Sequence, residues 1–389
     1  MLNKTEENCT GCRACEKICP THSIQMYYNS SGFLMPEVNW NKCNKCSKCI
    51  NVCPENEKKE LKKHYTEIYA IKAKSKEDSI DSATAGLFYM IAKKIIEKKG
   101  VVFGCIWKDK LSAIHIGTSE IKLLDKMRGS KYVQSDTKNV YVEIQEDLKL
   151  GKKVLFSGTG CQIAGLYSFL GKEYNNLYTV EILCHGVPSP KLFKKYISWL
   201  EKRLKCNIDE IHFRDKTKSG WGSGYKNIII CGDKEKSIYR QNDTYCLHFI
   251  DALIQRKVCY QCRYTGKKRV GNLVLGDFWG VQKYYPDFFS DKGVAVAAVT
   301  DWKGYELLEL IDDRIEKISI HWDEAAQMNE PLRTPIRKDK TRDIIYKHID
   351  EENLDEFFLT YMKIPFDLGA EIKQRIPYFI KKKIKRLMK

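Results

Sequence analysis

"CTGCRACEKICP" at residues 9–20 is matched, cysteine for cysteine, by "CNKCSKCINVCP" at residues 43–54. Both stretches have the spacing CxxCxxCxxxCP. A tight CxxCxxC loop directs three thiolates into one cavity, and the fourth cysteine of each stretch, ahead of a proline, reaches the neighbouring site. The repeat therefore predicts two 4Fe–4S clusters, one held by Cys9, Cys12, Cys15 and Cys53 and the other by Cys43, Cys46, Cys49 and Cys19.

Zinc is the alternative metal for these cysteines. Zinc sites usually combine two separated CxxC pairs, and neither stretch has that form. The spacing therefore favours iron–sulfur clusters over zinc.

Residues 1–58 resemble bacterial two-cluster ferredoxins over their whole length. Free ferredoxins of that type are typically acidic, whereas Lys42, Lys45 and Lys48 lie between or beside the cysteines of the second stretch. Two interpretations stay open. The lysines either offset the charge of the cluster, or they form a docking face for an acidic electron donor such as a soluble ferredoxin.

The composition bounds the class of protein. A chain of 389 residues, 43% of them hydrophobic, is long and apolar enough for two or three globular domains. No apolar run has the length of a membrane span, and the polar first residues do not form a signal peptide, so we expect a cytoplasmic protein. In a reducing compartment, sixteen cysteines indicate metal binding rather than disulfides.

The formal net charge of +17 suits nucleic acid, an anionic membrane or an acidic partner. The basic residues are dispersed and include no aromatic–basic motif of the RNA-binding kind. We therefore expect no nucleic acid partner.

A charged segment at residues 55–64 separates the cysteine-rich unit from an α+β core and predicts a separable N-terminal unit. We expect residues 65–150 and 151–300 to form the two parts of the core, and residues 301–389 to be mostly helical. A buried strand, a glycine-rich turn, a helix and a further strand predict a βαβ unit over residues 152–184.

Four further cysteines are expected to lie close together in the folded chain. Cys161 and Cys184 follow the two strands of the βαβ unit, whose carboxyl ends lie at the same edge of a parallel sheet. Cys259 and Cys262 form a CxxC pair that needs further ligands. Their spacing is compatible with a third 4Fe–4S cluster or with zinc. The remaining cysteines are expected to be small buried hydrophobes or surface thiols: Cys105, Cys206, Cys231 and Cys246.

Six motifs occur in one order: "RGSKYVQSD" (128–136), "VLFSGTGCQIAGL" (154–166), "EILCHGVPSPKLF" (181–193), "FRDK…GW" (213–221), "CYQCRY" (259–264) and "LGDFWG" (275–280). Together they resemble the coenzyme F-420 hydrogenase/dehydrogenase beta-subunit family over roughly residues 65–300. The resemblance implies a mixed α/β core that binds FAD beside a 4Fe–4S cluster. The cluster ligands that it implies are Cys161, Cys184, Cys259 and Cys262. Similar chains with a ferredoxin head occur among bacterial polysaccharide-biosynthesis proteins.

The sequence departs from the family pattern at three points. The usual SSGG turn is "ATAG" here, with Thr84 and Gly86, and Gly160 replaces the usual proline of GTPCQ. Gly271 and Asn272 stand where an aspartate is usual. Flavin binding remains expected, and the differences concern the details of the substrate pocket.

Two turns that open predicted helices are candidates for the flavin pyrophosphate. Their small residues let backbone N–H groups approach a phosphate, and the positive end of each helix favours an anion. An ordinary helix start is the alternative for each turn. Together with a polar loop, they supply the candidate cofactor-binding residues Thr84, Gly86, Ser130, Lys131, Gln134, Ser157, Gly158, Thr159 and Gln162.

Three residues are candidates for catalysis. His185 is expected either to donate a proton near the flavin or substrate, or to donate a hydrogen bond to cluster sulfur. Lys131 suits a phosphate or a negative charge at flavin N1. Arg214 suits a clamp on an anionic substrate, or an ion pair in a solvated turn. Trp221 and Trp279 are expected to stack on a flat ring or to pack in the core.

These observations predict an iron–sulfur flavoprotein oxidoreductase. Electrons would pass from a ferredoxin-like donor through three 4Fe–4S clusters to FAD and on to an organic acceptor. The resemblance suggests a cell-envelope or polysaccharide precursor as that acceptor. The alternative is an electron-transfer beta subunit of a larger hydrogenase/dehydrogenase-type complex linked to the deazaflavin coenzyme. An oligomer is compatible with both.

The last twenty residues, "AEIKQRIPYFIKKKIKRLMK" (370–389), place apolar residues on one helical stripe and basic residues around it. Two interpretations stay open. The helix either docks on the core with a basic outer face, or it lies on the anionic inner face of the cell membrane as a peripheral anchor.

Overall fold

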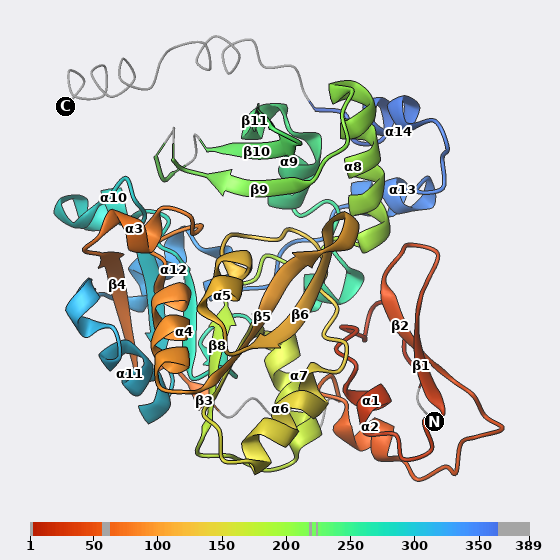
Figure 1. Ribbon diagram of the computed structural model, residues 1–389. Helices are drawn as coiled ribbons and strands as arrows, with labels where there is room; N and C mark the ends of the chain where they lie inside the picture. Colours follow the sequence, from red (N-terminus) through yellow and green to blue (C-terminus); the bar gives the residue numbers. More distant parts are fainter. Residues whose placement is uncertain (1–2, 57–62, 218–219, 223–224, 365–389) are drawn as a thin grey trace.

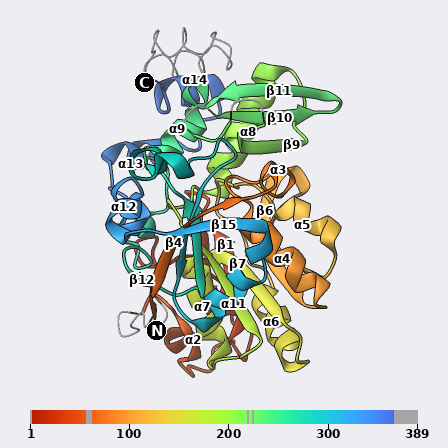
Figure 2. The same cartoon turned by 90° about the vertical axis from the view of Figure 1, so that its left-hand side faces the viewer.

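The computed structural model describes residues 3–56, 63–217, 220–222 and 225–364. An eight-stranded sheet forms the centre of the molecule, with helices on both of its faces (Figure 1). The cysteine-rich unit and a separate three-stranded sheet lie at different ends of this central body (Figures 1 and 2). The architecture is therefore mixed α+β, as predicted.

The central sheet has the strand order β15–β4–β14–β13–β8–β7–β5–β6. Strands β5, β7, β8 and β13 run parallel to one another, and the other neighbours pair antiparallel. The middle strands are mostly apolar, as expected where helices cover both faces, and Thr179 and Glu181 are buried polar exceptions on β8. The strands are β4 (Glu67–Ala73), β5 (Val101–Lys108), β6 (Ser112–Thr118), β7 (Val154–Thr159), β8 (Leu177–Ile182), β13 (Leu273–Asp277), β14 (Ala295–Val299) and β15 (Ile315–Ser319).

Helices cover the two faces of this sheet with apolar stripes. On α4, for example, Leu87, Met90, Ile91 and Ile95 recur at helical spacing and are buried against the sheet. One face is covered by α4 (Leu87–Glu97), α5 (Ile121–Met127) and α11 (Trp302–Glu309). The opposite face is covered by α6 (Val140–Lys149), α7 (Gly160–Leu170) and α12 (Trp322–Gln327).

The predicted βαβ unit is confirmed. Strand β7 leads through Thr159 directly into α7, and β8 returns parallel to β7, with Val154 opposite Leu177. The carboxyl ends of β7, β8 and β13 therefore lie at one edge of the sheet, where open α/β sheets bind ligands.

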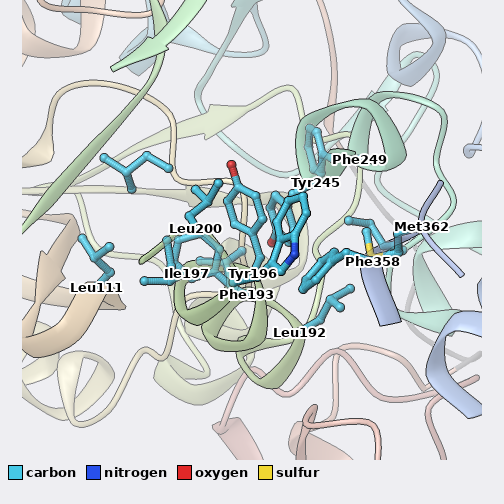
Figure 3. Packing of buried hydrophobic residues seen from close by; sticks show 14 of the residues in the cluster. Leu111, Leu192, Phe193, Tyr196, Ile197, Leu200, Tyr245, Phe249, Phe358 and Met362 are labelled. Atoms are coloured by element: carbon cyan, nitrogen blue, oxygen red, sulfur yellow. The ribbon is translucent and has the colours of Figure 1, made fainter. Parts of the chain in front are cut away.

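A second apolar core lies between the three-stranded sheet and four helices, as Figure 3 shows around α8. Helix α8 begins at Ser189, whose side chain accepts a hydrogen bond from the N–H of Leu192 at 3.1 Å. Tyr196 on its buried face stacks on Tyr245, with 4.7 Å between ring centroids. The elements are β9 (Glu210–Asp215), β10 (Lys226–Cys231), β11 (Lys234–Tyr239), α8 (Pro190–Leu204), α9 (Thr244–Ile250), α13 (Lys340–Lys347) and α14 (Leu354–Thr360).

Short elements complete the chain. In the cysteine-rich unit these are α1 (Ala14–Lys17), β1 (Ile24–Tyr28), β2 (Leu34–Val38) and α2 (Lys48–Val52). A two-residue ladder joins β3 (Lys63–His64) to β12 (Lys268–Arg269). The remaining turns of helix are α3 (Lys76–Ser79), α10 (Val281–Tyr284), η1 (Asp109–Leu111), η2 (Arg240–Asn242), η3 (Lys257–Gln261), η4 (Pro286–Phe288), η5 (Asp312–Arg314) and η6 (Glu330–Leu332).

The segment after residue 300 is not only helical. It also contributes β15, which pairs antiparallel with β4 and completes one edge of the central sheet. The stretch is short and polar, with Ile315 as its only fully buried residue, so its sequence carries little strand signal. Residues 370–389 lie outside the described residues. Within the described part of the chain, none of the helices combines the length and the apolar composition needed to cross a membrane.

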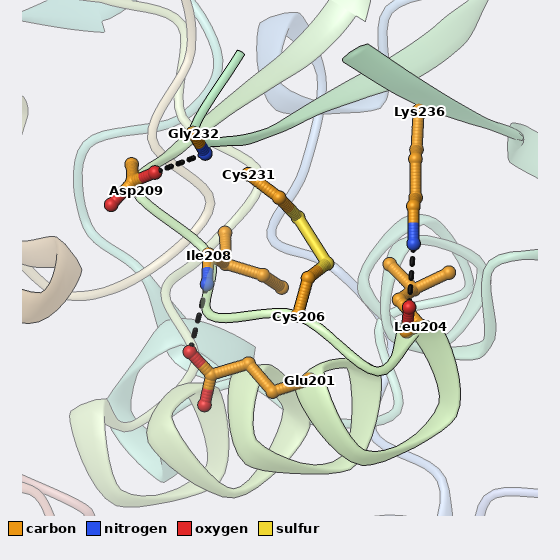
Figure 4. The surroundings of a disulfide bond; sticks show 8 residues. All are labelled: Glu201, Leu204, Cys206, Ile208, Asp209, Cys231, Gly232 and Lys236. Atoms are coloured by element: carbon orange, nitrogen blue, oxygen red, sulfur yellow. Dashed lines mark hydrogen bonds between the residues drawn. A yellow bond between two sulfur atoms is a disulfide. The ribbon is translucent and has the colours of Figure 1, made fainter. Parts of the chain in front are cut away.

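Two cysteines expected to be single thiols form a disulfide, Cys206–Cys231, which makes that prediction wrong (Figure 4). The bond joins the end of α8 to the end of β10. Glu201 supports this corner by accepting a hydrogen bond from the N–H of Ile208 at 2.9 Å, and the Lys236 ammonium donates to the Leu204 carbonyl at 2.5 Å. The two cysteines are 25 positions apart, so local spacing in the sequence does not reveal the pairing.

Candidate functional site

The cysteine-rich unit gathers its eight thiols into two cavities. The first quartet, Cys9, Cys12, Cys15 and Cys53, lines one small cavity. The second quartet, Cys19, Cys43, Cys46 and Cys49, lines another of about 120 Å³. Each quartet thus combines three cysteines of one stretch with the last cysteine of the other, which is the crossed arrangement expected from the spacing.

The two stretches repeat in conformation as well as in sequence. Gly11 and Arg13 have left-handed backbones, with φ of 68° and 67°, and the equivalent Lys45 and Ser47 have φ of 59° and 61°. These residues lie between or directly after the cysteines, where a left-handed turn reverses the chain within a few residues. The winding turns the sulfurs of each loop toward a common centre.

The two quartets differ in environment. Burial raises the pKa of the Cys12 thiol to about 12 and raises the pKa of Cys15 well above its ordinary value. Burial would also raise the pKa of Cys19, but hydrogen bonds with the Ser23 and Thr21 hydroxyls lower it to about 7. Buried thiolates of this kind need a cation beside them, as an iron cluster supplies.

A third quartet forms at the edge of the central sheet. Cys161 lies in the first turn of α7, Cys184 follows β8, and Cys259 and Cys262 lie in and after η3. All four line one cavity, and burial raises the pKa of every one of these thiols. Cys161 and Cys184 thus line the same cavity as the CxxC pair, and their role as the other two ligands stays a prediction.

A site for a single metal ion has a different geometry from a site for a four-iron cluster. Among the residues that the structure describes, no group of three or more His, Cys, Asp or Glu side chains is arranged to hold one metal ion. The thiolates of a four-iron cluster surround a cube rather than a single ion.

The first and third quartets adjoin. A Cβ atom added at Gly165 of α7 would lie 3.1 Å from both Cβ and Sγ of Cys12, and 2.8 Å from the Tyr141 hydroxyl. Cys161 lies one helical turn earlier on α7. Tyr141, fully buried, donates a hydrogen bond to the Gln162 carbonyl at 2.7 Å. The second quartet cavity, by contrast, is lined only by residues of the cysteine-rich unit.

Buried arginines fasten the cysteine-rich unit to the core. Arg256 donates to the carbonyls of Cys9 and Leu34 at 2.6 and 3.0 Å, and to Gln134 at 3.0 Å. Arg342 pairs with Glu6 at 3.0 Å. Arg13 pairs with Asp136 of the core through two hydrogen bonds. The cysteine-rich unit therefore packs directly against the core through these buried contacts.

The third quartet opens on a central cavity of about 670 Å³. Every candidate cofactor-binding and catalytic residue lines it: Thr84, Gly86, Ser130, Lys131, Gln134, Ser157, Gly158, Thr159, Gln162, His185 and Arg214. Six buried side-chain polar atoms in the described residues have no hydrogen-bond partner, and five belong to residues of this cavity: Thr10 Oγ1, Thr84 Oγ1, His115 Nδ1, Arg214 Nε and Arg240 Nε. Unpaired buried polar groups are costly, so the cavity has the chemistry of a site for a polar ligand.

Several candidate residues have a structural partner as well. Thr159 and Gln162 form the capping box that starts α7, and the Thr159 N–H donates to Gln162 at 3.0 Å. Gln134 donates to the Thr10 carbonyl at 3.0 Å. The Lys131 ammonium donates to the Arg128 carbonyl at 2.9 Å, and burial lowers its pKa. Thr159 and Gln162 thus cap an ordinary helix start and also line the cavity.

His185 makes a contact that neither interpretation foresaw. Its Nε2 lies 2.8 Å from the Ile250 carbonyl, which only accepts, so Nε2 carries the proton. Both roles of His185, as a proton donor near the flavin or substrate and as a hydrogen-bond donor to cluster sulfur, stay predictions.

Arg214 is paired inside the protein rather than in a solvated turn. Its guanidinium contacts Asp277 through two hydrogen bonds, one of 2.8 Å, and the Trp221 indole donates to the same carboxylate at 3.0 Å. Trp221 stacks on Trp279 with 5.2 Å between ring centroids and an angle of 7°. Trp221 therefore packs in the core, and Trp279 lies between it and the cavity.

Two candidate functional residues were not predicted from the sequence. His115 points from β6 into the cavity, and its Nε2 donates to the Ser157 carbonyl at 3.1 Å. Its signal was a polar residue at an apolar position of "SAIHIG". Gly165 carried no signal, because its close approach to Cys12 depends on residues far apart in the chain.

Residues 151–322 match the family described as coenzyme F420 hydrogenase/dehydrogenase, C terminus of the beta subunit. Residues 8–57 match the 4Fe-4S dicluster domain, which confirms the predicted N-terminal unit. The resemblance of the motifs to the beta-subunit family is thereby confirmed. The chain is an iron–sulfur protein of an oxidoreductase-type, electron-transfer family.

Among solved structures, the chain is similar to a chain of the xenon-derivatised F420-reducing [NiFe] hydrogenase complex from Methanosarcina barkeri. The two are 14% identical, the similarity covers 78% of this chain and 93% of that chain, and the TM-score is 0.45. No curated protein matches this chain.

Proposed function

We propose that this protein is the iron–sulfur electron-transfer subunit of a hydrogenase- or dehydrogenase-type oxidoreductase, with three 4Fe–4S clusters and an FAD. The match to the beta-subunit family favours a subunit of a larger complex over a reductase that works alone. One observation carries the proposal: the third quartet and all the flavin candidates line the same cavity.

The residues of the cavity fit a flavin. Its volume of about 670 Å³ lies in the range of cofactor sites. Helices α7 and α4 both begin at its wall, and Gly86 precedes α4 with φ of 76°, where an added Cβ would collide with the Asp78 carbonyl. Backbone N–H groups at these two helix starts are suited to the flavin pyrophosphate.

FAD, when bound, exchanges single electrons with iron–sulfur clusters and electron pairs with organic molecules. The protein's own residues would hold it. The His115 Nδ1 and Thr84 Oγ1 atoms, buried and unpartnered, would bond its polar groups. Lys131, whose pKa is lowered by burial, would add a hydrogen-bond donor.

The order of the quartets supports an electron path that joins the second quartet, the first quartet, the third quartet and the cavity. We propose a soluble ferredoxin as the one-electron partner. The family description points to the deazaflavin coenzyme F420 as the two-electron partner. The link to polysaccharide precursors remains a prediction from the resemblance.

Cofactor content tests the proposal. Anaerobically purified protein should contain about twelve irons and about one FAD per chain, with four irons for each cluster. Cys259→Ala should remove about four of these irons, whereas Cys246→Ala, which removes a buried thiol outside the quartets, should remove none. Iron that stays near eight in the wild-type protein, or denatured protein that releases no flavin, would contradict the proposal.

A further inference from the structure

The second quartet lies at the surface of the molecule. Cys46 is exposed, and so are residues 40–42 and 44–48 around it. The side chain of Trp40, which lines the second quartet cavity, is 50% exposed. Cys9 of the first quartet is only 8% exposed, and α1 packs that quartet against the core. A carrier protein in solution can therefore come closer to the second quartet than to the first.

The surface around the second quartet is basic. Between Lys17 and Pro54 the only carboxylate is Glu37, whereas the same stretch carries Lys42, Lys45 and Lys48. Lys17 pairs with Glu16 at 3.1 Å, but these three exposed ammonium groups form no ion pair with any residue that the structure describes. Three lysines offset the charge of about −2 that a cluster with four thiolates carries. Their exposed ammonium groups keep positive charge at the surface beside the cluster.

We propose that Trp40, Lys42, Lys45 and Lys48 form the docking face for an acidic one-electron carrier protein. We call these four residues the second-quartet face. The proposal rests on the proposed function and adds to it the site and the charge of the partner. In the exchange, one electron leaves the reduced centre of the carrier and one enters the second cluster, so no bond and no proton is involved.

The chemistry of the face suits brief encounters. Opposite charges speed association and orient the two proteins, and rim lysines act mainly on the association rate. Trp40 adds a flat apolar contact of the kind that anchors interfaces. Lys45 and Ser47 have left-handed backbones, which hold the loop in a defined shape beside the cysteines.

The test uses the full chain, purified anaerobically with its clusters, and a small acidic two-cluster ferredoxin as the probe. The charge-reversal variant combines Lys42→Glu, Lys45→Glu and Lys48→Glu. The control combines Lys122→Glu, Lys126→Glu and Lys194→Glu, which are exposed lysines on α5 and α8 with no ion pair among the described residues. Both variants change the net charge of the chain equally.

We expect the charge-reversal variant to weaken ferredoxin binding at low salt by about tenfold or more, measured as Kd by calorimetry. The loss should shrink at high ionic strength because salt screens surface charges. The milder variant with glutamine at the same three positions should fall between wild type and charge reversal. Trp40→Ala should weaken binding at all salt concentrations, and the control should bind within about twofold of wild type.

Two results would overturn the docking face: wild-type affinity in the charge-reversal variant, or an equal loss in the control. The iron and FAD content separates this outcome from a failure of the proposed function. If the purified chain lacks the iron of the third cluster or the FAD, the proposed function fails whatever the ferredoxin affinity. If both are present and ferredoxin binding ignores the second-quartet face, only the docking proposal fails.

Discussion

Gly165 lies against Cys12. A Cβ added to Gly165 would be 3.1 Å from the Cys12 sulfur, closer than nearly all real Cβ contacts. Because Cys161 is one turn away on the same helix, the absence of a side chain at position 165 lets the first and third quartets share a wall.

Gly165→Ala should separate these two quartets. The added methyl group would press on Cys12 and on the Tyr141 hydroxyl at 2.8 Å, and neither can yield freely in a packed interior. We expect weaker magnetic coupling between the reduced first and third clusters, measured by electron paramagnetic resonance. Gly117→Ala is the control, because it crowds the Phe103 ring at 2.5 Å and meets no cysteine. Unchanged coupling in Gly165→Ala would contradict the shared wall.

His115→Leu should weaken FAD binding. The variant keeps the bulk of the side chain but removes Nδ1, the unpartnered acceptor of the cavity. One lost hydrogen bond is worth about 0.5–1.5 kcal/mol, so the Kd of FAD should rise by up to about tenfold. His248→Leu is the matched control, since His248 is also buried but bonds its own helix through Thr244. An FAD affinity unaffected by His115→Leu would remove His115 from the flavin site.

The stability of the folded protein should depend on His115 in mild acid. Burial lowers its pKa from 6.5 to about 4, with Lys131 lowering it further and the Ser157 carbonyl and Asp136 opposing. Between pH 6.5 and 4 the unfolded chain therefore binds this proton and the folded chain does not. The stabilisation is complete above pH 6.5 and is lost as the pH falls, by up to about 1.4 kcal/mol per pH unit. Urea unfolding of His115→Leu across this range should show a shallower loss, and an identical slope would contradict the shift.

Arg256→Met should destabilise the whole molecule. The variant leaves the carbonyls of Cys9 and Leu34 and the Gln134 amide oxygen without their buried donor. We expect a loss of about 3 kcal/mol or more in the free energy of unfolding, together with a changed first-cluster spectrum. Arg203→Met on α8, where the guanidinium lies over Trp199 at 4.6 Å, should cost less than about 1 kcal/mol. Independent unfolding of the cysteine-rich unit in the wild-type protein would contradict this coupling.

The N-terminal unit stays a predicted domain of its own, and buried ion pairs join it to the core. The charged segment at residues 55–64 indicated a linker, but Arg13, Arg256 and Arg342 bury their charges across the junction. Buried charges require partners, and here the partners lie on the other side of the boundary. No local pattern in the sequence predicts such a pairing.

The sequence by itself determined the elements whose signals are local. The CxxCxxCxxxCP repeat predicted the dicluster domain because three ligands lie within seven residues, and the apolar runs and glycine turn at residues 152–184 predicted the βαβ unit. The ordered motifs were enough to indicate the beta-subunit family. In each case, residues close in the chain are close in space because the backbone between them has few conformations.

Tertiary structure alone decided the contacts between distant segments. Arg214 with Asp277, Cys206 with Cys231, and Cys12 with Gly165 are 63, 25 and 153 residues apart, the last from the difference 165 − 12. Each contact depends on how sheets and helices pack in the folded chain. Only there is water excluded, so that a buried charge needs a partner and the absence of a side chain allows close approach. The unpaired atoms of the central cavity belong to this second class, because only the folded chain buries the Nδ1 atom of His115 away from water.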